Sequence, residues 1–218
     1  MENTWDRYIR LMRERPSLFS QSDELRIITD EKSVREFCEK NGIAVGVVYE
    51  SPYSLLVVDL VTDKSGRAFT YERLVPANPG AVVCMPVYDG KFVLLRQFRH
   101  AIRTEQYAFP RGFGEPGISS EDNLKKELAE EIGARVLDLT YLGKTVADSG
   151  MLGNFVDVYC CNVTEPEFKP GYEGIRQLCT VDADVFERMI ASGEINDGFT
   201  LSAYALYSAH QNLKKGGE

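Results

Sequence analysis

Residues 112–134 read GFGEPGISSEDNLKKELAEEIGA, a glycine-rich loop that runs into a short acidic helix. Ser119 can cap the start of this helix, with an acidic residue three positions later, and Gly133 suits the left-handed conformation that commonly ends one. These signals predict a helix of about three turns between the two residues. The segment decides more about fold and function than any other part of the chain.

The last two turns of the predicted helix carry carboxylates at Glu127, Glu130 and Glu131. Its apolar stripe consists of Leu124, Leu128 and Ile132. Glu127 and Glu131 fall beside this stripe, so we expect both to be partly desolvated. Like charges at this spacing repel by roughly 1–4 kcal/mol, and the C-terminal end of a helix disfavours anions. A bound divalent metal would relieve both effects, and the competing interpretation is a solvated acidic helix end.

The segment resembles the signature of the Nudix hydrolases, G-x5-E-x7-R-E-U-x-E-E-x-G-U with U aliphatic, a family that cleaves nucleoside diphosphates linked to another group. The matching positions are Gly112, Glu127, Leu128, Glu130, Glu131 and Gly133. Ile118 stands where the family has Glu, and Lys126 stands where it has Arg. In the family, that acid and that base brace the loop against the helix. Glu115 lies in the same loop and is an alternative source of the acid.

The resemblance implies a magnesium-dependent centre, with manganese as an alternative ion. Glu127 and Glu131 are expected as direct ligands, and Glu130 as a ligand or a water-orienting acid. The backbone carbonyl of Arg111 is expected as a further ligand. In the ADP-ribose pyrophosphatase branch of the family a late loop supplies one more acid, and the matching residue is Glu173 in GYEGIRQL, which could bind the metal or deprotonate water. A solvated loop glutamate is the alternative interpretation of Glu173.

Three arginines near the signature are candidates for binding phosphate. Arg99 ends the strand-like run LLRQFR, and Arg103 follows shortly after it. Arg111 lies in YAFPRGF, where the family commonly has E-L-P-A-G, so this chain carries a cation where relatives have a small residue. The planar guanidinium group matches phosphate oxygens through paired hydrogen bonds. For Arg99 and Arg103, surface ion pairing is the alternative.

The 218-residue chain has a formal net charge of −8 and a pI near 5.0. Proteins that bind a nucleic-acid polymer need clustered Lys and Arg, so the charge argues against such a partner but allows a small phosphorylated substrate. The five cysteines show no C-x-x-C spacing and lie mostly in apolar runs, which indicates reduced, buried thiols. No stretch has the length and apolarity of a membrane span, and the charged N-terminus lacks a signal core. We therefore expect no membrane partner and a cytoplasmic location.

Helical spacing dominates the first 42 residues. The apolar stripe of the first predicted helix consists of Trp5, Tyr8, Ile9 and Met12. Such a stripe indicates packing in a core or against a partner subunit rather than a ligand site, and we favour the contact with a partner subunit. From Ile43 onward, β-branched runs separated by turn residues predict three antiparallel strands. The order of elements resembles the ADP-ribose pyrophosphatase branch of the family, so residues 1–78 are expected to form an N-terminal extension that builds a homodimer.

Residues 79–218 are expected to form the Nudix hydrolase domain. A hairpin turn at Asp89-Gly90 leads towards the glycine-rich loop. After the acidic helix, the runs VLDLTYLG, FVDVYCCNV and IRQLCTV predict strands, and helices are predicted near 183–192 and 200–214. The expected fold class is α+β, a Nudix-type α/β/α sandwich with a mixed sheet, preceded by a helical and antiparallel β extension.

The leading functional hypothesis is magnesium-dependent hydrolysis of the pyrophosphate bond of ADP-ribose or a related nucleoside diphosphate sugar. The nearest alternative is another nucleotide sugar or a dinucleotide, since Ser149 and Asn154 stand where the ADP-ribose branch has proline and glutamate. The alternative outside the enzymes is a Nudix-fold protein that senses a nucleotide without cleaving it. The departures from the signature at Ile118 and Lys126 leave this alternative open. The retained helix carboxylates favour catalysis. We therefore predict that Glu131→Gln abolishes turnover and leaves the fold intact.

Overall fold

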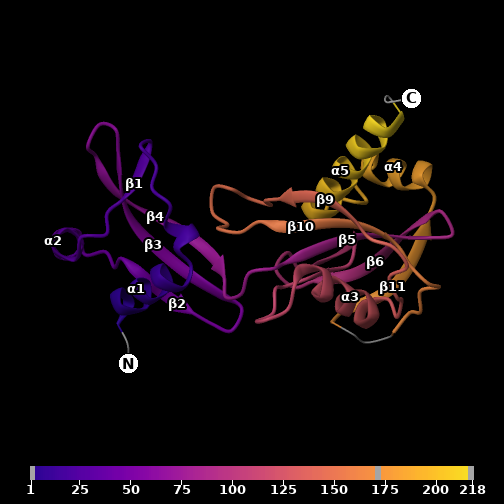
Figure 1. Cartoon of the computed structure of the whole chain (residues 1–218), viewed down its shortest axis with the longest axis horizontal. Coiled ribbons are helices and arrows are strands. Elements are labelled where there is room, and N and C mark those ends of the chain that lie inside the picture. The colour runs from indigo at the N-terminus through magenta and orange to yellow at the C-terminus, as the bar shows by residue number, and fades with distance from the viewer. Residues whose placement is uncertain (1–2, 170–172, 216–218) are drawn as a thin grey trace. The chain divides into compact units, whose positions relative to one another are not determined.

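The computed structural model describes residues 3–169 and 173–215. Backbone contacts group the chain into two compact units, whose helices and strands are labelled in Figure 1. The first unit extends to Ala77 and includes the segment Asp148–Asn154. The second contains Asn78–Ala147 and continues from Phe155 to the C-terminal end. The return of Asp148–Asn154 to the first unit is a feature that the sequence pattern does not predict.

The sheet of the first unit is built around β3 (Ser54–Asp63). One edge of β3 pairs along its length with β4 (Ala68–Pro76), and the other pairs with β2 (Gly46–Glu50). Both pairings are antiparallel. The prediction of three antiparallel strands in this region is therefore confirmed.

Two short segments extend this sheet. β1 (Leu25–Ile27) continues the edge that β2 occupies, with Leu25 opposite Asp63. The segment Asp148–Asn154 lies along β4, where the backbone N–H of Leu74 donates to the carbonyl of Met151 at 2.9 Å. Neither segment is long enough to show a period of two, which is why sequence patterning does not reveal them.

The helices of the first unit are α1 (Thr4–Glu14), a 3-10 turn at Pro16–Phe19 and α2 (Glu31–Asn41). Asn3 caps α1 through a hydrogen bond from the backbone N–H of Asp6 at 2.9 Å. The predicted helical character of the first 42 residues is confirmed for α1 and α2. Between them lies β1, which the prediction did not include.

Tyr8 of α1 lies inside its own unit and has no exposed surface. Its hydroxyl donates to Asp59 at 2.5 Å, and Arg73 donates to both oxygens of the same carboxylate at 2.6 and 3.0 Å. The ring of Trp5 stacks on that of Tyr8 with 5.3 Å between centroids. The interpretation of this stripe as a subunit contact is therefore wrong for Tyr8, because a buried carboxylate needs the hydroxyl as a partner.

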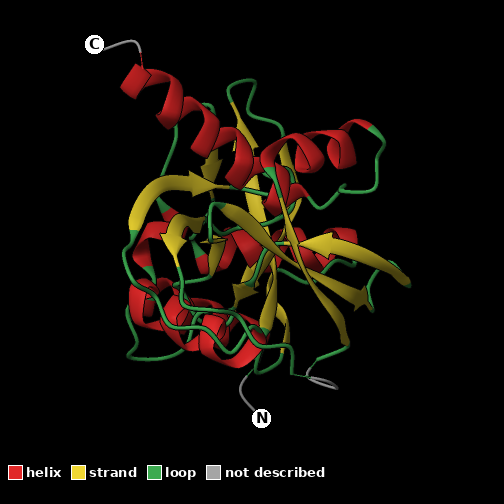
Figure 2. Cartoon of the chain, turned by 90° about the vertical axis from the view of Figure 1, so that its right-hand side faces the viewer, coloured by secondary structure: helices red, strands yellow, loops and turns green. Residues whose placement is uncertain are grey.

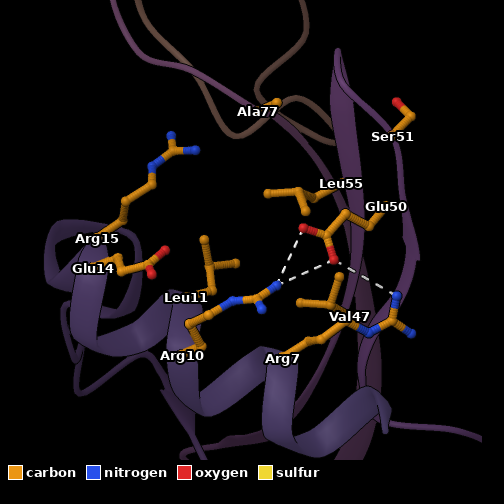
Figure 3. A pocket seen from close by; sticks show the side chains of 10 residues that line it. All are labelled: Arg7, Arg10, Leu11, Glu14, Arg15, Val47, Glu50, Ser51, Leu55 and Ala77. Atoms are coloured by element: carbon orange, nitrogen blue, oxygen red, sulfur yellow. Dashed lines mark hydrogen bonds and ion pairs between the residues drawn. The ribbon is translucent and has the colours of Figure 1, made fainter. Parts of the chain in front are cut away.

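A cleft of about 100 Å³ lies beside α1 in the first unit, and Figure 3 shows its lining side chains. A nitrogen of Arg10 donates to both carboxylate oxygens of Glu50 at 3.2 and 3.3 Å, and Arg7 lies 3.7 Å from that carboxylate. Arg15 donates to the carbonyl of Pro76 at 2.6 Å. These bonds join α1 to the strands of its own unit.

The second unit contains a sheet with the strand order β11-β6-β5-β10-β9. These strands are β5 (Val82–Tyr88), β6 (Lys91–Arg99), β9 (Thr140–Thr145), β10 (Val156–Asn162) and β11 (Ile175–Val181). β10 runs parallel to β5, and the other neighbours along this order are antiparallel. The predicted mixed sheet is confirmed, and each predicted run contains a strand, although β9 begins at Thr140, in the middle of the run VLDLTYLG.

The hairpin between β5 and β6 turns at Asp89 and Gly90, whose φ angles are 49° and 74°. Two successive positive φ angles fit the tight turn that twisted strands require, so the hairpin prediction is confirmed. Two further short strands, β7 (Thr104–Ala108) and β8 (Arg111–Gly112), pair with β6 and β5. They carry the chain from the hairpin into the glycine-rich loop.

Helices cover both faces of this sheet. α3 (Ser120–Glu131) buries its apolar residues on one face, whereas α4 (Ala183–Ala191) and α5 (Gly198–Lys215) cover the other. In Figure 2, α5 is the helix that ends at the C-terminus. The arrangement is the predicted α/β/α sandwich, and successive side chains of β5 enter the two cores alternately.

None of the described cysteines is joined in a disulfide. Cys84 and Cys161 are buried between β5, β10 and α3, and the others are partly exposed. The prediction of burial holds fully for this pair, and the reduced state of the cysteines stays a prediction. In the part of the chain that the structure describes, no helix has the length and apolarity of a membrane span.

Candidate active site

Helix α3 begins and ends as its sequence predicts. The Ser119 hydroxyl oxygen accepts from the backbone N–H of Asp122 at 3.1 Å, and Gly133 adopts a φ of 63° directly after the helix. At the C-terminal end, Lys169 donates to the free carbonyl of Ala129 at 2.7 Å. A cation is favoured at this end of a helix, so Lys169 offsets part of the repulsion that the acidic residues experience there.

The glycine-rich loop fits closely against α3. A Cβ atom at Gly112 would overlap the carboxyl group of Glu127, so with this arrangement of the side chain the position takes glycine, and a larger residue would displace the carboxyl group. Asn123, which is 1% exposed, donates to the carbonyl of Phe113 at 2.8 Å. Residues of the helix therefore contact the loop where it leaves β8.

The acid–base contact that links the glycine-rich loop to α3 in the family is present here with a different acid. Lys126 forms a close ion pair with Glu115, which lies three residues before Ile118 in the loop. Ile118 points partly into solvent, with 38% of its surface exposed. The alternative acid considered from the sequence thus lies opposite the lysine, and the connection between loop and helix is retained.

Glu127 and Glu131 are the inner carboxylates of α3. Burial, followed by the charges of Glu130 and Glu173, raises the pKa of Glu127 to about 7. Burial, followed by the charge of Glu127, raises the pKa of Glu131 to about 8. Glu131 is 2% exposed, and one of its oxygens accepts from the backbone N–H of Arg111 at 3.1 Å. The expected partial desolvation of these two residues is confirmed.

Glu130 faces outward and differs from the inner pair. Its side chain is 39% exposed and lies 3.9 Å from the ammonium group of Lys126. Its charge nevertheless contributes to the raised pKa of Glu127. Glu130 therefore lies beside the inner pair, on the solvent side of it.

Arg111 joins the helix carboxylates to the start of α5. Its backbone binds Glu131, and its guanidinium group donates to Asp197 at 2.9 Å. The guanidinium carbon also lies 5.1 Å from the ring centre of Phe199. The cation at this position, noted from the sequence, is thus held between an acid and an aromatic ring.

A buried polar network fixes Asp197. One oxygen of Asp197 accepts from the backbone N–H and hydroxyl of Thr200, at 3.0 and 2.8 Å. The hydroxyl oxygen of Thr200 accepts from the backbone N–H of Phe109 at 3.0 Å. Sequence reasoning did not single out Asp197 or Thr200, although an Asp three residues before a Thr at a helix start is a capping signal.

Arg99 lies at the same end of the sheet and is partly buried. Burial and the neighbouring charge of Arg111 lower its pKa to about 10, against the opposing effects of Asp197, Glu131 and Glu173. Its Nε is buried and has no hydrogen-bond partner among the described residues. A desolvated guanidinium group with unused donors is suited to bind an anion.

Glu173 and Arg103 occupy different surroundings. Glu173 is exposed, but its charge acts on Glu127 and Arg99, so it lies on the side of the carboxylates. Arg103 shares a hydrogen bond of 2.8 Å with His100, and its guanidinium lies over the ring of Phe98. The structure therefore groups Glu173 with the inner carboxylates and Arg99, while Arg103 as a substrate contact stays a prediction.

The residues present fit a divalent cation. Glu127 and Glu131 supply hard oxygen donors, and a cation would offset the burial and repulsion that raise both pKa values. Among residues 3–169 and 173–215, no group of three or more acidic, histidine or cysteine side chains is spaced to hold a metal ion together. The full donor set, including Glu130, Glu173 and the carbonyl of Arg111, stays a prediction.

Comparisons with known proteins extend these observations. The chain is 32% identical over 111 residues to the ADP compounds hydrolase NudE of Escherichia coli strain K12, an alignment that covers 50% of this chain and 59% of NudE. It is 26% identical over 172 residues to the ADP-ribose pyrophosphatase of Bacillus subtilis strain 168, covering 77% and 91% of the two chains. The match to NudE therefore spans about three fifths of that relative.

Among solved structures, a crystal structure of ADP compounds hydrolase superposes with a TM-score of 0.66 at 23% identity, covering 80% of this chain and 94% of the other. This likeness supports the fold alone. The family described as NUDIX domain matches residues 77–194, more than half of the chain, including the loop, α3 and its carboxylates. The match includes the signature segment, which the structure folds into a loop and an acidic helix. The chain therefore belongs to the Nudix hydrolase family.

Proposed function

We propose that the protein hydrolyses the pyrophosphate bond of ADP-ribose or a related nucleoside diphosphate sugar in the presence of Mg2+. Water adds across the phosphorus–oxygen–phosphorus link, and the products are a nucleoside monophosphate and a sugar phosphate. The observation that carries the proposal is the pair Glu127 and Glu131, desolvated, mutually repelling and placed beside Gly112. The names of the two relatives support an ADP-linked substrate.

Each residue of the site has a part in this proposal. Glu127 and Glu131 hold the cation, with Glu130 and the carbonyl of Arg111 as further donors. When bound, Mg2+ neutralises charge on the diphosphate and polarises its phosphorus–oxygen bonds. The guanidinium group of Arg99 binds phosphate oxygens through paired hydrogen bonds.

Proton transfer requires a base near the inner carboxylates. Glu173 is exposed to solvent and close enough to Glu127 and Glu131 for its charge to act on both. We assign it to accept the proton of the attacking water, a role that a carboxylate can fill at neutral pH. Arg111, held by Asp197 and Phe199, supplies a second positive group beside Arg99. Mn2+ as a substitute ion, a homodimer and a cytoplasmic location remain predictions.

The test is a substrate panel with matched variants. Purified protein is incubated with ADP-ribose, other nucleotide sugars, dinucleoside polyphosphates and nucleoside triphosphates, with Mg2+ or with a chelator, and products are identified by mass spectrometry. We expect Mg2+-dependent release of a nucleoside monophosphate from ADP-linked substrates. Glu127→Gln should abolish it, and Glu121→Gln, an exposed change on the same helix, should not. Binding of nucleotides without cleavage across the panel would instead support a sensor.

A further inference from the structure

Gln97 is a buried polar residue close to the proposed base. It lies on β6 with 4% of its surface exposed. Its side-chain nitrogen donates to the backbone carbonyl of Glu173 at 2.8 Å, across 76 residues of sequence. The roles assigned above do not involve Gln97, so its burial in the sheet calls for a separate explanation.

The backbone that Gln97 contacts has an unusual conformation. Glu173 has a φ of 41°, in the left-handed region that residues other than glycine seldom adopt, and Gly174 follows with a φ of 76°. The backbone N–H of Phe98 donates to the carbonyl of Gly174 at 3.1 Å. Two adjacent residues of β6 therefore bind two adjacent carbonyls of this loop. Such a backbone persists only when its surroundings hold it in place.

Gln97 is also aligned with the site. Gln97 and Arg99 are two positions apart on β6, so their side chains leave the same face of the sheet. Glu173 acts electrostatically on Arg99 and on the inner carboxylates, which lie towards that face. A residue that fixes the Glu173 backbone from this strand fixes the base relative to the arginine that binds phosphate.

The hydrogen-bonding groups of the Gln97 amide show whether the residue holds the Glu173 backbone or only fills space in the sheet. The orientation of the amide is set by Glu173, because only the nitrogen end can donate to a carbonyl. The other end, Oε1, is buried without a hydrogen-bond partner among the described residues. An apolar side chain of similar length would fill the space without a buried unpaired oxygen. The bond to Glu173 is the contact that only the amide can make.

We propose that Gln97 is a positioning residue that holds the Glu173 backbone, and with it the carboxylate, in place for the hydrolysis of the diphosphate. The proposal rests on the proposed function. It concerns a residue that acts through Glu173 and does not itself touch the substrate.

The experiment combines kinetics with hydrogen exchange in full-length protein. Gln97→Met keeps an unbranched side chain of similar size and removes the amide. We expect kcat for ADP-ribose to fall about tenfold with KM changed less than about twofold, a loss of roughly 1.4 kcal/mol in transition-state stabilisation. In a Glu173→Gln background the same change should have no further effect, because both act through one group. Gln177→Met removes an exposed amide from β11 and serves as the matched control.

Hydrogen exchange tests whether Gln97 holds the loop, independently of catalytic activity. Loss of the Gln97 bond should release the loop and increase exchange of the Phe98 amide at least about tenfold, since its acceptor is Gly174. Unchanged exchange at Phe98, or kinetic effects that add fully to those of Glu173→Gln, would overturn the proposal. Full activity of Glu173→Gln would also overturn it and would leave the hydrolase function standing. A wild-type protein that cleaves no member of the panel would refute the proposed function, and the exchange result would still decide whether Gln97 holds the loop.

Discussion

Glu131→Gln should separate stability from activity at the acidic helix. The substitution removes a charge and keeps an oxygen that can accept from the backbone N–H of Arg111. Burial and Glu127 raise the pKa of Glu131 from the ordinary 4.5 to about 8. The folded chain therefore holds this proton more tightly than the unfolded chain. The stability that this tighter proton binding contributes is fully present below about pH 4.5 and is lost as the pH rises through about 8.

The interval between the two pKa values sets the magnitude. About 3.5 pH units at about 1.4 kcal/mol each gives a cost of about 5 kcal/mol for full ionisation of Glu131 in the metal-free protein, and on the order of 4 kcal/mol at pH 8, where the group is half ionised. Glutamine should recover about 2 kcal/mol of this, because its own amide nitrogen must be buried. For a chain of this length that corresponds to a rise of roughly 4–8 °C in the unfolding temperature. Turnover with Mg2+ should fall at least about a hundredfold, because a ligand charge is lost.

The assay is thermal unfolding in chelator at pH 5 and pH 8, followed by activity measurements with Mg2+. The stabilisation should be large at pH 8 and small at pH 5, where most of the Glu131 carboxyl groups are protonated. Added Mg2+ should raise the unfolding temperature of the wild type more than that of the variant. Glu121→Gln on the exposed first turn is the control. A variant with wild-type turnover, or with equal stabilisation at both pH values, would refute the reasoning.

Four other substitutions address the loop and the arginine. Gly112→Ala places a methyl group where the Glu127 carboxyl group lies and displaces that carboxyl group, so kcat should fall at least about a hundredfold in kinetic assays. Overpacking at this position should cost about 1–3 kcal/mol in unfolding free energy, which thermal unfolding measures. Glu115→Gln and Lys126→Gln should each lower kcat severalfold, with the double variant no worse than either single one, because they share one ion pair. Arg99→Lys should raise KM for the diphosphate about tenfold without changing the unfolding temperature, because Lys lacks the planar donor fork. A KM equal to that of the wild type would exclude Arg99 from phosphate binding.

The parts of the fold that local sequence determines could be predicted. The cap at Ser119, the end at Gly133 and the turn at Asp89-Gly90 each depend on residues within a few positions of one another, and all are present. The strands of the second unit were visible because they are long enough to show an apolar pattern. By contrast, β1 and β8 contain three and two residues, too few for any periodicity. Their pairing depends on distant strands that sequence spacing does not describe.

The same limit applies to the candidate site. Glu127 and Glu131 were identified because they lie on one helix, four residues apart. Asp197 contacts Arg111 across 86 residues, and Gln97 contacts Glu173 across 76, so no local motif links either pair. The aromatic stripe on α1 shows a related limit, because its spacing predicts a buried helix face but does not distinguish the core of its own unit from a partner subunit. Tyr8 finds its partner, Asp59, in its own unit.

The departures from the signature also bear on catalysis. If the brace between loop and helix had been lost, the loop would have lost one of its contacts with α3 and would rely on the hydrogen bond from Asn123 to Phe113. Instead Lys126 pairs with Glu115, an acid displaced by three positions from the one the signature expects. The loop therefore reaches the same helix through a different backbone position, and the inner carboxylates stay desolvated against it. A nucleotide sensor gains nothing from holding two repelling carboxylates in place, because their burial costs stability unless a cation binds. The altered signature is thus better explained as a rearranged support for a metal-dependent site than as a sign that the site has lost its function.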